Sequence, residues 1–163
     1  MADIVSERYA QSLYEVAKDE KQEKEYLEEL TAVCGAFREN PDFLKLLTTP
    51  SIAFEDKQNV LKTVFEGKLR PFMLNFLMLT TEKGRIGLIH EMREAYKEQY
   101  YFENNIAEVC AVTAVPMSDA LRDRLKNKMQ AVTGRQVVLE TSVDPEIIGG
   151  IVVKLGNEQF DTS

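Results

Sequence analysis

The residues of this sequence that could do chemistry are few and widely spaced. The one histidine, His90, lies on the polar flank of an amphipathic helical pattern, without a cysteine or carboxylate at the spacing of a catalytic triad or metal site. The two cysteines, Cys34 and Cys110, lie far apart within apolar patterns, which predicts buried free thiols in a reducing compartment. We therefore expect no catalytic residue, no metal ligand and no cofactor.

Three other features resemble functional motifs but have simpler explanations. Gly149-Gly150 precedes a strand pattern instead of a helix, so it lacks the geometry with which glycine-rich loops hold phosphates. Asp144 and Glu146 lie in a turn, where a carboxylate usually serves the turn itself. The acidic run 20–29 is interrupted by lysines, which is typical of a solvated helix face and less often of a docking site.

The composition limits the class of protein and partner. Of the 163 residues, 44% are hydrophobic and 29% are charged, as in soluble globular proteins. The longest uncharged apolar stretch, 72–79, is far shorter than the ~20 residues of a membrane helix, and the first residues do not resemble an export signal. A net charge of -7 argues against binding to nucleic acid backbones. The expected partners are proteins or small molecules.

Helical periodicity dominates the chain up to residue 105, where we place a domain boundary. Asn40 is expected to cap the third helix, and Gly67 and Gly84 to end the fourth and fifth. These signals predict an N-terminal six-helix bundle over residues 1–105. The expected helices are 6–18, 26–39, 41–47, 56–66, 70–82 and 86–102.

The fifth predicted helix differs from the others because apolar residues occupy almost every side of it. Such a helix is either enclosed by the core or lies at an edge, with one face on the core and another on a partner. Together with Tyr9, Leu13 and Tyr14 of the first helix, it could form an apolar groove for an amphipathic helix. The alternative is that all of these residues belong to the core.

Beyond residue 105 the pattern alternates, which indicates strands. We expect a strand at 106–115, a helix at 118–133 capped by Ser118 and ended by Gly134, and a strand at 137–140. Leu121, Leu125 and Met129 share one face of that helix with Val132. The fold class is mainly α with a small α/β part, in which residues 106–163 form a β-α-β-β domain.

The last segment predicts a β-hairpin. Residues 151–155 are β-prone, with 151, 153 and 155 on one face, and a two-residue type II′ turn follows them. The residues expected to turn the chain are Asp144, Pro145, Gly149, Gly150, Gly156 and Asn157.

Three segments together resemble one family: RYAxxLY at 8–14, EKGR at 82–85 and DPxIIGGIVV at 144–153. In this order and at these spacings they resemble the delta subunit of F-type ATP synthase, the family that includes the mitochondrial oligomycin-sensitivity-conferring protein. The resemblance covers the whole chain. It implies a noncatalytic connector of the peripheral stalk, which keeps the catalytic head from turning with the rotor.

The resemblance also implies partners. The N-terminal bundle would bind the N-terminal helix of an alpha subunit in a groove between its first and fifth helices, and the C-terminal domain would hold the C-terminal helices of the b subunits. No nucleic acid is implied, and membrane association, at the cytoplasmic face of a bacterial plasma membrane, would occur only through the complex. Carried over to this sequence, the groove residues are Tyr9, Ser12, Leu13, Phe76 and Leu79.

Two points stay open at the level of sequence. The family pattern usually continues beyond the hairpin into a basic C-terminal helix, whereas this sequence ends at 161–163, either because the subunit is short or because a tail is missing. A small RNA-binding or helix-binding adaptor is the alternative function, because β-α-β-β domains often bind nucleic acid. The six Lys and Arg against eight Asp and Glu after residue 105 argue against RNA.

Overall fold

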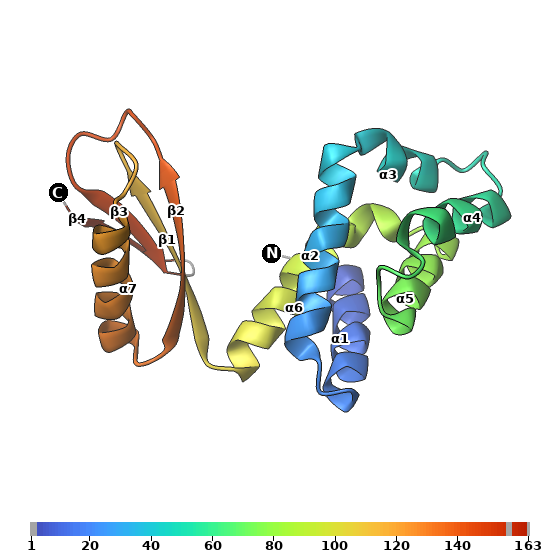
Figure 1. Cartoon of the computed structure of the whole chain (residues 1–163), viewed down its shortest axis with the longest axis horizontal. Helices are drawn as coiled ribbons and strands as arrows, with labels where there is room; N and C mark the ends of the chain where they lie inside the picture. Colours follow the sequence, from blue (N-terminus) through green and yellow to red (C-terminus); the bar gives the residue numbers. More distant parts are fainter. Residues whose placement is uncertain (1–2, 156–157, 163) are drawn as a thin grey trace. The chain divides into compact units, whose positions relative to one another are not determined.

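The computed structural model describes residues 3–155 and 158–162, with side chains described through residue 155. The chain is mainly helical with a small sheet, and it packs as two compact units, Met1–Tyr100 and Tyr101–Ser163 (Figure 1). The sequence pattern changes at residue 105, whereas packing divides the chain a few residues earlier, inside the last helix of the first unit. Within the described residues, no helix has the length and apolarity needed to cross a membrane.

The six helices expected from the sequence are all present, and they contribute to one apolar core. The core is built around large buried side chains such as Tyr14 and Tyr96, whose ring centroids lie 5.2 Å apart. A 3-10 turn, η1, precedes the last helix where the sequence predicted continuous α-helix. The elements are α1 (Ile4–Asp19), α2 (Glu23–Glu39), α3 (Pro41–Thr48), α4 (Phe54–Phe65), α5 (Pro71–Glu82), η1 (Ile86–Leu88) and α6 (Ile89–Glu103).

Polar side chains set two of the helix ends differently from expectation. Asp3 accepts a hydrogen bond from the Ser6 backbone N–H at 2.8 Å, so α1 begins at Ile4, before the expected Ser6. Asn40 does not cap α3, as its Nδ2 instead donates to the carbonyl of Ala36 at 3.3 Å. That capping prediction was wrong because the chain passes directly from α2 into α3, and the open carbonyls at the end of α2 attract the amide.

Helix α5 is not fully enclosed. Met73, Phe76 and Leu77 are buried in the core, whereas Phe72 and Leu79 remain 53% and 46% exposed. Of the two arrangements that the sequence left open, the structure therefore has the edge helix, with one face on the core and an uncovered apolar face outside.

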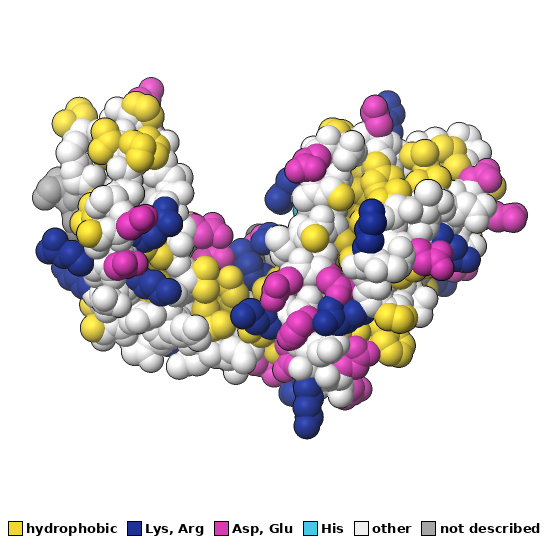
Figure 2. Space-filling view, viewed as in Figure 1, with side chains coloured by type: hydrophobic (Ala, Val, Ile, Leu, Met, Phe, Trp, Pro, Cys, Tyr) yellow, Lys and Arg dark blue, Asp and Glu magenta, His cyan; other side chains and the backbone are white. Residues whose placement is uncertain are grey.

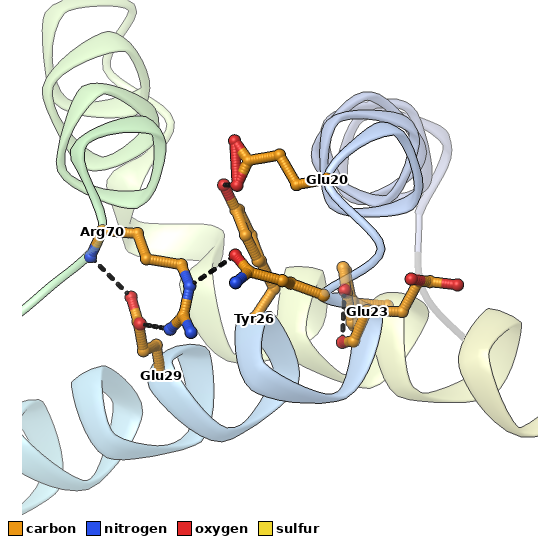
Figure 3. Close-up of polar contacts among 7 residues, drawn as sticks. Glu20, Glu23, Tyr26, Glu29 and Arg70 are labelled. Atoms are coloured by element: carbon orange, nitrogen blue, oxygen red, sulfur yellow. Dashed lines mark hydrogen bonds and ion pairs between the residues drawn. The ribbon is translucent and has the colours of Figure 1, made fainter.

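A polar junction around Arg70 joins the start of α5 to α2 (Figure 3). Glu29 accepts a hydrogen bond from the Arg70 backbone N–H at 2.9 Å and forms an ion pair with its guanidinium. Arg70 Nε donates to Gln22 Oε1 at 2.8 Å, and its guanidinium carbon lies 5.8 Å from the centroid of the Tyr26 ring. The Tyr26 hydroxyl donates to Glu20 at 2.7 Å, and burial, followed by this hydrogen bond, raises the pKa of Tyr26 well above its ordinary value.

The acidic run 20–29 is therefore more than a solvated face. The side chain of Glu29 is only 15% exposed, and Glu20 holds the hydroxyl of a buried tyrosine. The solvated-face prediction was wrong for Glu29, because the sequence pattern cannot show that the loop before α5 returns to this side of α2. Glu20 is exposed as predicted, although it also accepts the hydrogen bond from Tyr26.

The second unit is a four-stranded sheet with one helix against it. Its elements are β1 (Ile106–Thr113), α7 (Asp119–Thr133), β2 (Gln136–Val143), β3 (Ile151–Leu155) and β4 (Glu158–Thr162), and the strand order is β2-β1-β3-β4. Strands β1 and β2 are parallel, and β3 is antiparallel to both β1 and β4. The predicted β-α-β-β order was one strand short, since the hairpin supplies two strands.

The turns of this unit follow local chemistry. Ser118 Oγ accepts from the Leu121 N–H at 3.2 Å, and Gly134 ends α7 with φ +68°. Asp144 Oδ1 accepts from the Glu146 N–H at 3.0 Å, so this carboxylate serves its own turn. Leu155 lies opposite Glu158 across the hairpin, which leaves two residues for the loop; that loop, Gly156-Asn157, lies outside the described residues. Of the other expected turn residues, Pro145 follows Asp144 in the same turn, and Gly149 and Gly150 have positive φ angles of +65° and +78°.

The two thiols differ in burial. Cys34 is fully buried in the helical core, 3.8 Å from the carbonyl oxygen of Ile89, and burial raises its pKa to about 11. Cys110 is only partly buried, so the expectation of two buried thiols was wrong for this residue. It lies on β1, one residue after the inward-facing Val109, and alternation directs it to the other face of the sheet.

We expect Glu29→Ala to lower the free energy of unfolding by about 1 to 3 kcal/mol, because the Arg70 N–H and guanidinium lose their shared acceptor. The measurement is urea unfolding followed by circular dichroism. Glu28→Ala is the control, as it makes the same exchange at the exposed neighbouring position and should cost within about 0.5 kcal/mol of zero. Equal losses in the two variants would contradict the structural role of the junction.

Cys34 should be almost unreactive in the folded protein. With a pKa of about 11 in place of 9.0, its thiolate fraction at about pH 8 falls about 100-fold before any loss of access is counted. The rate of disulfide exchange with an aromatic disulfide reagent, measured in a Cys110→Ser variant with and without urea, tests this. Comparable rates in the two conditions would show that the thiol is accessible.

Candidate docking surfaces

The one histidine, considered above as a catalytic or metal-binding candidate, lies on the last helix of the first unit. His90 is partly buried on α6, where burial, and then the charge of Arg38, lower its pKa, so the imidazole is neutral near pH 7. Its Nδ1 atom has no hydrogen-bond partner within the described structure. No group of three or more His, Cys, Asp or Glu among the described residues could hold a metal ion.

Helices α1 and α5 lie against each other, and two aromatic rings form part of their contact. Tyr9 of α1 and Phe76 of α5 pack edge to face, with ring centroids 6.3 Å apart and an interplanar angle of 74°. Segments more than 60 residues apart in sequence therefore share one surface, which we call the α1/α5 seam and define by Tyr9, Ser12, Leu13, Phe72, Phe76 and Leu79.

Burial separates these residues into a floor and a rim. Leu13 and Phe76 are 3% and 7% exposed, so they belong to the core and offer little surface to a partner. Tyr9 is partly buried, whereas Ser12 and Leu79 are exposed. A docked helix would therefore meet mainly the rim.

Sequence reasoning missed Phe72 as a member of the seam. It lies one helical turn before Phe76 and is 53% exposed, on the same side of α5 as Leu79. The signal was present in the spacing, because residues four and seven apart share a helix face. The sequence alone did not distinguish Phe72 from the other residues of α5, since nearly all of its neighbours are also apolar.

A second uncovered surface lies in the other unit, between α7 and β3. A cavity of about 450 Å³ is lined by one face of α7 and by two residues of β3. Of the four α7 residues expected on one apolar face, only Met129 is buried, while Val132 is 71% exposed and Leu121 is 39% exposed. The α7 lining residues are Leu121, Arg124, Leu125, Lys128, Met129 and Val132.

Comparison with known proteins assigns the chain to a family. The family model described as ATP synthase delta (OSCP) subunit matches residues 5–163. The ATP synthase subunit delta of Alkaliphilus metalliredigens is 33% identical over 161 residues, covering 99% of this chain and 89% of that protein. That of Synechocystis sp. is 36% identical over 166 residues, covering 98% of this chain and 86% of that protein.

A solved structure shares the fold. A chain in the cryo-EM structure of the Toxoplasma gondii mitochondrial ATP synthase hexamer aligns with a TM-score of 0.74 and 23% identity, over 98% of this chain and 90% of that chain. The family match extends from the first helix to the hairpin, through both units described above. The chain belongs to the ATP synthase delta (OSCP) subunit family.

Proposed function

We propose that the α1/α5 seam binds the amphipathic N-terminal helix of an alpha subunit and that the second unit binds the C-terminal helices of the b subunits. As a member of its family, the chain is a noncatalytic subunit of an F-type ATP synthase and a component of the peripheral stalk. The proposal adds which surface meets which partner. In it, residues 1–105 act as a six-helix bundle on the catalytic head and residues 106–163 act on the stalk.

The observation that carries the proposal is the contact between Tyr9 and Phe76 beside the exposed Leu79. It joins α1 and α5 into one surface and leaves uncovered apolar side chains on its rim. Exposed Leu and Phe side chains at helical spacing are what an amphipathic helix buries when it docks on a helical surface.

The available energy suits a moderate contact. Leu13 and Phe76 are already buried, so the gain comes from completing the burial of Tyr9, Phe72 and Leu79. At roughly 1.5 to 3 kcal/mol for a fully buried apolar side chain, three partly exposed ones contribute only a few kcal/mol. Association itself costs on the order of 4 to 15 kcal/mol, so this contact requires further contacts for stable attachment.

Linking two contacts in one chain supplies that stability. Once one unit is bound, the other meets its partner at a high effective concentration, which strengthens the whole attachment without new contacts. A connector held at both ends would keep the catalytic head from turning with the rotor. In a bacterial complex it would lie at the cytoplasmic face of the plasma membrane, held there only through the other subunits.

Leu79→Asp should weaken binding of a peptide from the alpha N-terminus by about 2 kcal/mol or more, roughly 30-fold, because a carboxylate would be buried against an apolar helix. Leu79 is 46% exposed, so circular dichroism should show an unchanged fold. Fluorescence anisotropy with labelled peptide measures the affinity.

The matched control is Val132→Asp, which introduces the same carboxylate at an exposed aliphatic residue of the other unit. It should leave alpha-peptide binding within about twofold of wild type, as surface changes remote from a contact usually have small effects. If Leu79→Asp bound the peptide as tightly as Val132→Asp does, the seam would not be the alpha site.

A further inference from the structure

We propose that Ser12 and Asn75 select the helix that docks on the α1/α5 seam, by requiring an uncharged amide side chain within its apolar stripe. We call these two residues the polar pair. The inference rests on the proposed binding of an amphipathic helix to the seam. It adds the chemical feature by which the seam would accept one such helix, in one register, and reject helices with a wholly apolar stripe.

On α1, the row of residues beside the seam is apolar except for Ser12. The half-buried residues of this helix are Val5, Tyr9 and Val16. Together with Ser12 they recur at intervals of four, three and four residues, which places them in one row. Tyr9 shows that this row faces α5, because its ring packs against that of Phe76. Ser12 therefore interrupts an otherwise apolar row, one helical turn after the contact.

The exposed row of α5 has the same form. Phe72, Asn75 and Leu79 are all exposed and follow each other at intervals of three and four residues. Asn75 directly precedes Phe76, whose ring contacts α1, and it is the one polar residue from 72 to 79. Figure 2 shows hydrophobic side chains gathered over the lower end of α5, as that helix is drawn in Figure 1. A helix that covers the exposed apolar side chains of α5 would thus also cover an amide.

Within the part of the chain that the structure describes, neither side chain of the polar pair makes a hydrogen bond. The hydroxyls of Thr31 and Thr63, on other helices of this unit, instead donate to backbone carbonyls of their own helices, at 2.8 and 2.9 Å. The Ser12 hydroxyl and the Asn75 amide can therefore bond to a partner. Covering them without one is unfavourable, because each would lose its water and gain no hydrogen bond.

An amide on the docked helix suits the polar pair better than an apolar or a charged side chain. A hydroxyl and an amide can each donate and accept, so a glutamine or asparagine can complement both. An apolar side chain would leave them without partners, and a charged one would lose hydration without an opposite charge in either row. A single polar contact within an apolar helix interface also fixes the register, as it does in coiled coils.

The test uses the full chain and two synthetic amphipathic helices of about 18 residues, or about five turns. Both carry the same leucine stripe, but in one of them a glutamine replaces the central leucine. Fluorescence anisotropy gives the ratio of their affinities for wild type and for Asn75→Leu. The substitution should shift this ratio about fivefold toward the all-leucine helix, because the glutamine loses its partner and the leucine no longer covers an unpaired amide.

The register is tested by moving the glutamine one helical turn along the stripe, which should remove its advantage on wild type. A ratio that Asn75→Leu leaves unchanged would overturn the proposal. So would a glutamine that binds equally well at either position, or a wild-type chain that binds neither helix.

Asn59→Leu is the matched control. It makes the same exchange at an exposed position of α4, outside both rows, and should change the ratio less than about twofold. Asn75→Ala removes the amide without adding a large apolar side chain, and Ser12→Ala removes the hydroxyl; both should shift the ratio in the same direction as Asn75→Leu. Circular dichroism should show an unchanged fold, since all three positions are exposed. An equal shift in Asn59→Leu would mean that only surface apolarity is sensed, and would overturn the polar pair.

A second measurement separates this inference from the proposed function. If Asn75→Leu leaves the ratio unchanged while Leu79→Asp weakens binding of the alpha peptide, the seam is the alpha site and the polar pair does not select its partner. If Asn75→Leu shifts the ratio while Leu79→Asp leaves binding of the alpha peptide unchanged, the polar pair stands and the assignment to the alpha subunit fails.

Discussion

The position of α5 depends on the polar junction at its first turn. Apolar contact is nondirectional, so a helix with apolar residues on nearly every side could rotate in its place at little cost. The hydrogen bonds and ion pair between Arg70 and Glu29 are directional, and they fix the start of α5 against α2. With that end fixed, Phe76 turns toward α1 and Leu79 turns outward. The surface available to a partner is thus decided by a polar contact at the start of the helix.

The α1/α5 seam contains both core and surface residues. Leu13 and Phe76 behave as core, and Ser12 and Leu79 as surface, because adjacent positions on a helix differ by about 100° in direction. A docking surface built in this way has a rigid floor shared with the core. In the proposed contact a partner would meet preformed positions, which would lower the entropy lost on binding.

The second unit reaches a similar result by a different route. Among the described residues of the second unit few apolar side chains are buried, and α7 leaves part of its own apolar row exposed. The uncovered row then lies beside Arg124 and Lys128. Each unit thus leaves apolar side chains exposed among its described residues.

The sequence by itself determined the kinds of element and their order, because helical and alternating periodicity and turn glycines act within a few residues of the chain. The family was indicated by the resemblance of three segments, 8–14, 82–85 and 144–153. It also indicated that Tyr9, Leu13 and the fifth helix belong together. It did not reveal that Glu29 holds Arg70, that Asn40 bonds backward to α2, that Phe72 lies on the rim, or that the α7 row stays open. Each of these depends on which distant segment occupies the space beside a side chain, and only the tertiary structure decides that.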